Sequence, residues 1–160
     1  RDGIDVTQAT VSRDIKELGL VLPEVAKPVA AYVPAVKIGR FVYTSGQIPF
    51  VQGEIKFKGK LGAEVSLEDG YEAAKVCALN CLAAIRTVTS LDDVAQVVKI
   101  VGFVSSAAGF TDQPKVINGA SELIGKVFGS IGEHARSAVG VAELPLNVPV
   151  EVEMIIAVKQ

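Results

Sequence analysis

The chain has 160 residues, of which 49% are hydrophobic, and its 16 basic and 18 acidic residues give a formal net charge of -2. This length and hydrophobic content fit one folded domain with a sizeable core and exclude a largely disordered chain. The slightly acidic balance argues against a protein that acts mainly through nucleic-acid phosphates, and no hydrophobic run approaches the roughly 20 residues of a membrane-spanning helix.

The two cysteines, Cys77 and Cys81, lie four residues apart in a stretch of helical periodicity. This spacing stacks them on one helix face, as is typical of small core residues. Together with the single histidine they are too few for a structural zinc site or a disulfide framework. The N-terminus also lacks the residue order of a signal peptide. We therefore expect packed thiols, no metal and a cytoplasmic protein.

Residues 1–20 are expected to form an N-terminal extension with a short helix over residues 5–18. Thr7 is the candidate N-cap and Gly19 ends the helix. Residues 21–160 are expected to form a single domain. The passage that opens this domain contains three prolines, which favour extended backbone: Pro23, Pro28 and Pro34.

Hydrophobic alternation next predicts three strands. Residues 32–38 and 41–45 are separated by Gly39-Arg40, which suits a tight hairpin. Residues 54–60 place three lysines on one strand face. Such a row is typical of a solvated strand face, and a track for phosphate groups is the alternative.

Two amphipathic helices and three more strands complete the pattern. Ser66 is typical of a helix N-cap followed by acidic residues, and the hydrophobic stripe after it extends to Val88. The later elements are a continuous strand, a helix and two closing strands: 95–105, 116–131, 135–144 and 149–158. The order β-β-β-α-β-α-β-β predicts an α+β fold, with a mixed sheet and two helices on one face.

The alternation in the last two strands suggests what each sheet face carries. The hydrophobic even-numbered positions of the final strand should face the helices. We expect Val139 and Val141 to share that face. Arg136, Ala138 and Gly140 then lie on the opposite face. Small side chains there would let another chain approach closely, so we expect closed homo-oligomers through this face.

The sequence offers a small set of candidate functional residues: Arg136, Glu151, Ser45, Tyr32 and Asn118. An arginine can hold a planar carboxylate through two parallel hydrogen bonds, and a nearby glutamate could activate water. Each residue also has a purely structural interpretation. Arg136 and Glu151 could form a cross-strand ion pair, Ser45-Gly46 a turn, and Asn118 a helix surface. His134 is interpreted as a surface residue at a strand entry.

Three segments of the chain resemble the reactive intermediate deaminase (Rid) family, also called the YjgF family. They are the stretches 43–49 (YTSGQIP), 135–145 (ARSAVGVAELP) and 150–153 (VEVE). The likeness covers roughly Leu18 to Gln160 in the right order. It implies a chorismate-mutase-like α+β fold that forms homotrimers, with a central β-barrel and sites in the clefts between subunits.

The resemblance also implies an activity. The expected reaction is hydrolytic deamination of reactive enamines and imines, such as 2-aminoacrylate and 2-imino acids, to 2-oxo acids and ammonia, without a cofactor. By position, Arg136 would hold the substrate carboxylate and Glu151 would lie near the attacking water. The remaining matched positions would line the substrate cleft: Tyr32, Ser45, Gly46, Phe103, Asn118 and Ala138. An RNA-acting endoribonuclease or translation inhibitor is the alternative, and a non-catalytic trimer that binds small acids is a third possibility.

The chain departs from the family pattern at two positions beside the arginine. His134 stands where a small residue or proline is usual, and Ala138 stands where cysteine is frequent. Residues 6–18 additionally resemble the recognition-helix region of the arginine repressor. Because the helices and wing that would brace such a helix are missing from the sequence, we expect no DNA binding.

Overall fold

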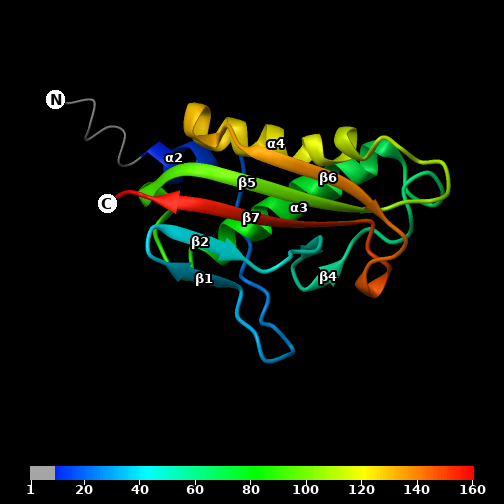
Figure 1. Cartoon of the computed structure of the whole chain (residues 1–160), viewed down its shortest axis with the longest axis horizontal. Helices are drawn as coiled ribbons and strands as arrows, with labels where there is room; N and C mark the ends of the chain where they lie inside the picture. Colours follow the sequence, from blue (N-terminus) through cyan, green and yellow to red (C-terminus); the bar gives the residue numbers. More distant parts are fainter. Residues whose placement is uncertain (1–9) are drawn as a thin grey trace.

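A five-stranded mixed sheet with two long helices on one face organises the protein, as the computed structural model of residues 10–160 shows (Figure 1). The strand order is β1-β2-β7-β5-β6, in which only β5 and β6 run parallel. The helices and strands are α2 (Thr10–Glu17), β1 (Ala35–Ile38), β2 (Phe41–Thr44), β3 (Phe50–Val51), β4 (Glu54–Ile55), α3 (Leu67–Ile85), β5 (Val94–Ser105), α4 (Gln113–Phe128), β6 (Ala135–Val141) and β7 (Val150–Val158), with short 3-10 turns η1 (Leu91–Asp93), η2 (Gly129–Gly132) and η3 (Pro145–Asn147).

The predicted fold class is confirmed, and the element order differs at one place. The strand expected over residues 54–60 shrinks to the two residues of β4, which pairs only with β3 in a separate small sheet. Gly59 has a φ of 113°, a conformation that interrupts extended backbone. Lys56 and Lys58 on this segment are exposed.

Helix α2 connects the N-terminal segment to the core. Val11 and Ile15 lie four residues apart on one helix face, and both are buried in the main hydrophobic cluster. Gly19 follows the helix with a φ of 70°, so it ends the helix as predicted. The first residues of the predicted helix, including the expected cap Thr7, lie outside the described residues. The part of the repressor-like segment that is described therefore packs against its own domain.

Helix α3 begins at the predicted cap, where the Ser66 hydroxyl accepts a hydrogen bond from the Asp69 backbone N–H at 3.1 Å. Cys77 and Cys81 are free thiols on its buried face, as expected, and they approach backbone carbonyls of β7. Burial raises the pKa of both thiols, that of Cys81 to about 12. The helix ends at Ile85, three residues before the predicted end of the hydrophobic stripe.

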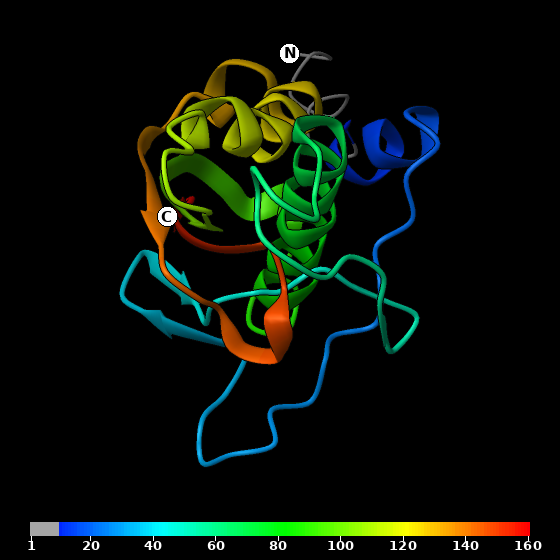
Figure 2. The same cartoon turned by 90° about the vertical axis from the view of Figure 1, so that its right-hand side faces the viewer.

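The core lies between the helices and the sheet. Figure 2 shows α3 and α4 on the same side of the sheet, while the segment between α2 and β1 runs outside the main body. The even-numbered residues of β7, from Val150 to Val158, are all buried beneath the helices as predicted.

The facial assignment of β6 is opposite to the expectation. Arg136 pairs with the fully buried Ile100, and Ala138 pairs with Gly102 and packs against the core. Val139 is 44% exposed on the other face. A Cβ on Gly102 would collide with Ile117 of α4. The small residues therefore let α4 approach the sheet closely, and they do not form the open face.

The face of the sheet turned away from the helices carries several exposed hydrophobic side chains. Strand alternation and pairing place them on β1, β2 and β6: Val36, Ile38, Phe41, Tyr43 and Val139. Phe103 and Ile155 extend this face across β5 and β7 and are half-buried. We call this surface the open face. Exposed hydrophobic side chains, and not the small residues of β6 that were expected, give this face the character of a contact surface. Association through it stays a prediction.

Candidate functional site

Helix α4 holds the guanidinium group of Arg136. One terminal nitrogen, Nη1, donates to Asn118 Oδ1 at 2.8 Å and to Ser121 Oγ at 3.2 Å. Asn118 and Ser121 are three residues apart, so they project from the same helix face toward the edge strand β6. The structure thus brings Arg136 and Asn118 together, and it adds Ser121, which the sequence patterns did not single out.

These contacts leave one edge of the guanidinium group open. Nη1 carries two hydrogens, and α4 provides an acceptor for each. Among residues 10–160 no acceptor is within hydrogen-bonding range of Nε or Nη2. The Nε–Nη2 edge offers two parallel N–H donors with the spacing of a carboxylate. Arg136 is half-buried, so such a pair would be partly shielded from water.

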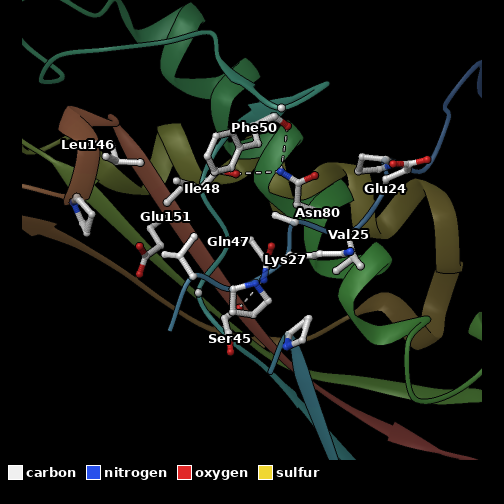
Figure 3. Close-up of a pocket in the computed structure, with 18 of the residues that line it drawn as sticks. Glu24, Val25, Lys27, Ser45, Gln47, Ile48, Phe50, Asn80, Leu146 and Glu151 are labelled. Atoms are coloured by element: carbon white, nitrogen blue, oxygen red, sulfur yellow. Dashed lines mark hydrogen bonds between the residues drawn. The ribbon is translucent and has the colours of Figure 1, made fainter. Parts of the chain in front are cut away.

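A separate pocket of about 980 Å³ lies beside the start of β7 (Figure 3). Segments 23–34 and 45–53 form most of its wall, to which they contribute several prolines and hydrophobic residues. Figure 3 shows Glu151 on the side opposite Glu24. Four of the predicted site residues line the pocket: Tyr32, Ser45, Gly46 and Glu151.

Glu151 is one of the two carboxylates that line this pocket, with Glu24 as the other, and it lies against the backbone of Gly46. A Cβ at position 46 would be 2.5 Å from Glu151 Oε2, so glycine is what permits this approach. Partial burial, followed by the nearby charge of Glu153, raises the pKa of Glu151 above its usual value. The carboxyl group therefore keeps its proton to a higher pH than an ordinary glutamate.

Side-chain hydrogen bonds to backbone carbonyls hold the loops that form the rest of the pocket wall. Ser45 Oγ donates to the Val33 carbonyl at 2.6 Å, which fixes the segment before β1 against the end of β2. Asn80 of α3 donates to the carbonyls of Ile48 and Phe50 at 2.9 and 3.2 Å. The sequence patterns did not single out Asn80. A lone amide within the hydrophobic stripe of a helix was the signal that could have identified it.

Arg136 and Glu151 do not meet within one chain. Arg136 shares a register row with Ile100 and Met154, beneath the helices. Glu151 shares a row with Phe103 and lies on the open face. The two rows are three residues apart along the strands, about 10 Å, and β6 and β7 are two strand spacings apart, about another 10 Å. The alternative of an Arg136–Glu151 ion pair within the chain is excluded.

Phe103 and Ala138 therefore belong to different halves of the predicted site. Phe103 is the cross-strand neighbour of Glu151 on the open face. Ala138 follows Arg136 on the helix-covered face of β6. We call Arg136 with Asn118 and Ser121 the clamp, and the cavity around Glu151 the Glu151 pocket.

His134 is half-buried, which differs from the expected surface position. Its Nε2 lies 2.9 Å from Ser121 Oγ and its Nδ1 lies 2.7 Å from the Gly132 carbonyl. In the described part of the chain, no cluster of histidine, cysteine or acidic side chains could hold a metal ion. Within those same residues, no helix has the length and hydrophobicity needed to cross a membrane.

The chain is similar to known proteins over most of its length. The family described as "YjgF/chorismate_mutase-like, putative endoribonuclease" matches residues 12–157. Protein TCP17 of Trypanosoma cruzi is 40% identical over 153 residues, which are 94% of this chain and 96% of that protein. A 2-iminobutanoate/2-iminopropanoate deaminase of Dermatophagoides farinae is 31% identical over 138 residues, which are 86% of this chain and 93% of that protein.

Solved structures agree with the fold. The crystal structure of protein Atu1372 of Agrobacterium tumefaciens, of unknown function, has a TM-score of 0.88 and 39% identity, with 97% of each chain covered. Escherichia coli TdcF with bound serine has a TM-score of 0.60 and 27% identity, with 87% of this chain and 94% of that chain covered.

Two further comparisons bear on the expectations from sequence. An arginine repressor of Heliobacterium modesticaldum is 43% identical over only 54 residues, 34% of this chain and 31% of that protein, so this likeness is short and partial. The mitochondrial protein Mmf1 of Saccharomyces cerevisiae is 33% identical over 156 residues, 97% of this chain and 94% of that protein. The cytoplasmic location therefore stays a prediction.

Proposed function

This chain belongs to the YjgF/chorismate_mutase-like family, and from that premise we propose that it hydrolyses 2-imino acids and their enamine tautomers to 2-oxo acids and ammonia. The observation that carries the proposal is the clamp, in which α4 orients Arg136 and leaves the Nε–Nη2 edge open. A relative that is named an imine deaminase and a related structure that holds serine support a small ligand with a carboxylate.

In the proposed reaction, Arg136 binds the substrate carboxylate and thereby fixes the adjacent C=N bond. Water adds to the imine carbon, its proton passes to Glu151, and the carbon–nitrogen bond then breaks. Before this bond breaks, the nitrogen takes the proton held by Glu151 and then the proton of the added hydroxyl group, so it leaves as ammonia while the added oxygen becomes the carbonyl of the 2-oxo acid. Because imine hydrolysis is intrinsically fast, the main contributions of the protein are to orient the substrate and to exclude part of the solvent from the pocket.

We propose that the two halves of the site come from different subunits of a homotrimer. Arg136 and Glu151 project from opposite sheet faces of one chain, too far apart to share a small substrate. The open face exposes Tyr43 and Val139 by 46% and 44%, an exposure that association with further copies of the chain would remove. In this arrangement the clamp of one subunit faces the Glu151 pocket of its neighbour.

The proposal is tested by measuring the mass of the assembly in solution and the rate at which the protein hydrolyses an imine. Light scattering of the wild-type protein is expected to give three chain masses. The imine of 2-aminobutanoate, generated in place by an amino-acid oxidase, should disappear faster when the protein is added. Arg136→Lys should remove most of this acceleration, and Arg86→Lys, an exposed residue at the end of α3, should not. A monomer, or a fully active Arg136→Lys trimer, would contradict the proposed site.

An RNA-acting protein is the second candidate, because the family description itself names an endoribonuclease. The formal net charge of -2 argues against it, since binding to RNA phosphates normally uses an excess of basic residues. Salt-dependent RNA cleavage without imine turnover would favour this candidate. Binding of 2-oxobutanoate without turnover would instead favour a non-catalytic small-acid-binding protein.

A further inference from the structure

His134, Ser121 and Arg136 form a continuous chain of polar contacts at the entry of β6. His134 Nδ1 lies 2.7 Å from the Gly132 carbonyl, and its Nε2 lies 2.9 Å from Ser121 Oγ. Ser121 Oγ in turn accepts a hydrogen bond from Arg136 Nη1 at 3.2 Å. The chain of contacts thus runs from the turn before β6 to the guanidinium group.

The contact between His134 and the Gly132 carbonyl fixes the direction of the other hydrogen bonds. A carbonyl oxygen only accepts hydrogen bonds, so the Nδ1 atom of His134 carries the proton that faces Gly132. In the neutral imidazole Nε2 is then an acceptor, and the Ser121 hydroxyl donates to it. The lone pairs of the Ser121 oxygen are left for Arg136. Each donor points the same way, from Arg136 to Ser121 to His134 to Gly132, an order in which neighbouring bonds strengthen one another.

The Gly132 end of this series of hydrogen bonds is anchored in the hydrophobic core. Gly132 is buried, and a Cβ there would be 2.7 Å from the Ile124 carbonyl of α4. The turn that presents the Gly132 carbonyl is therefore packed against the same helix that carries Asn118 and Ser121. The histidine connects this fixed point to a serine that would otherwise rotate freely.

We propose that His134 is a positioning residue for Arg136. It orients the Ser121 hydroxyl so that Ser121 accepts from Nη1, and this keeps the Nε–Nη2 edge turned toward the ligand. His134 touches no substrate in this arrangement. The consequence for ligand binding rests on the carboxylate-binding role of Arg136 proposed above. The orientation of the guanidinium group itself does not depend on that role.

Two measurements test the orientation without any ligand. Because His134 is the only histidine, the nitrogen NMR signals of the imidazole are unambiguous, and they should show that the neutral ring carries its proton on Nδ1. Rotation of the Arg136 guanidinium group about its Nε–Cζ bond should be slow in the wild-type protein. It should accelerate in His134→Ala as much as in Ser121→Ala. A proton on Nε2, or unchanged rotation in His134→Ala, would overturn the proposal.

A double-mutant cycle tests the consequence for binding, with 2-oxobutanoate as the probe. Loss of one directed hydrogen bond should weaken binding about threefold to tenfold in His134→Ala and in Ser121→Ala. The double variant should be no weaker than Ser121→Ala, since both changes break one chain of contacts. His134→Gln, whose amide oxygen can accept from Ser121, should recover part of the affinity. Ser130→Ala, an exposed serine in η2, is the matched control.

The outcomes separate the two proposals. The role of the histidine is merely structural if the two single variants lose affinity for 2-oxobutanoate independently, so that the losses multiply in the double variant. The same conclusion follows if His134→Ala lowers the melting temperature and leaves the affinity unchanged. If wild-type protein neither binds 2-oxobutanoate nor accelerates loss of the imine, the proposed function is wrong. The tautomer and the guanidinium rotation then decide the positioning role by themselves.

Discussion

Replacement of Arg136 by lysine separates the clamp from a purely structural arginine. Lysine keeps the positive charge but replaces a planar fork of five donors with a compact ammonium group. One ammonium group cannot reproduce the two bonds to Asn118 and Ser121 and still offer a parallel pair to a carboxylate. We expect ligand affinity and turnover to fall steeply while the fold survives.

The expected size of each effect follows from the contacts. Arg136→Ala, which truncates one partner of a shielded charge pair, should cost about 2–5 kcal/mol, or a loss of roughly 30-fold to 4,000-fold in kcat/KM. This range is the upper limit for Arg136→Lys, which keeps the charge and loses only the planar fork. The stability effect is smaller. Two hydrogen bonds from a half-buried side chain to α4 contribute about 1–2 kcal/mol in total, or roughly 2–8 °C of melting temperature for a chain of this size.

The assay combines three measurements on one set of variants. Imine turnover gives kcat/KM, calorimetry with 2-oxobutanoate gives affinity, and thermal unfolding gives stability. Arg86→Lys is the matched control, because Arg86 is exposed at the C-cap of α3. The reasoning is refuted if Arg136→Lys retains turnover within about threefold of Arg86→Lys, a difference no larger than one weak hydrogen bond.

Three further changes probe the Glu151 pocket. Asn80→Ala leaves two loop carbonyls without their hydrogen-bond donor and should lower the free energy of unfolding, measured by urea titration, by about 2–3 kcal/mol. If the loss is no greater than that of Asn118→Ala, the assigned contacts are wrong. Gly46→Ala should displace the Glu151 carboxylate and reduce imine turnover with little change in melting temperature; unchanged turnover would remove Glu151 from the reaction. The raised pKa of Glu151 means that the folded protein binds more protons than the unfolded chain, so the free energy of unfolding contributed by this group falls as pH rises past the usual range of a carboxyl. Glu151→Gln should therefore gain stability relative to wild type as pH rises, whereas Glu143→Gln, at an exposed position after β6, serves as its control; parallel curves would show that the carboxyl is not desolvated.

The sequence alone determined the features that depend on local chemistry or on the side-chain periodicity of a single helix or strand. Ser66 predicted the start of α3 because a serine oxygen can accept from an N–H of the first turn. The Gly39-Arg40 pair predicted the β1–β2 hairpin, and the unbroken hydrophobic positions of β7 predicted its buried face. Residue type made Arg136 and Glu151 candidates, and the likeness to the Rid family supplied their expected roles by position in matching segments.

The tertiary structure decided how those residues are placed relative to one another. Alternation gives the period of an edge strand such as β6 but not which set of residues faces the helices when both sets are small or hydrophobic. The close approach of α4 over Gly102 selected that face, and it turned Arg136 toward Asn118 and Ser121. The pairing of β5 with both neighbours then set a three-residue offset between Arg136 and Glu151. An odd offset puts two residues on opposite faces of a sheet, and strand register depends on contacts between segments that are distant in the sequence.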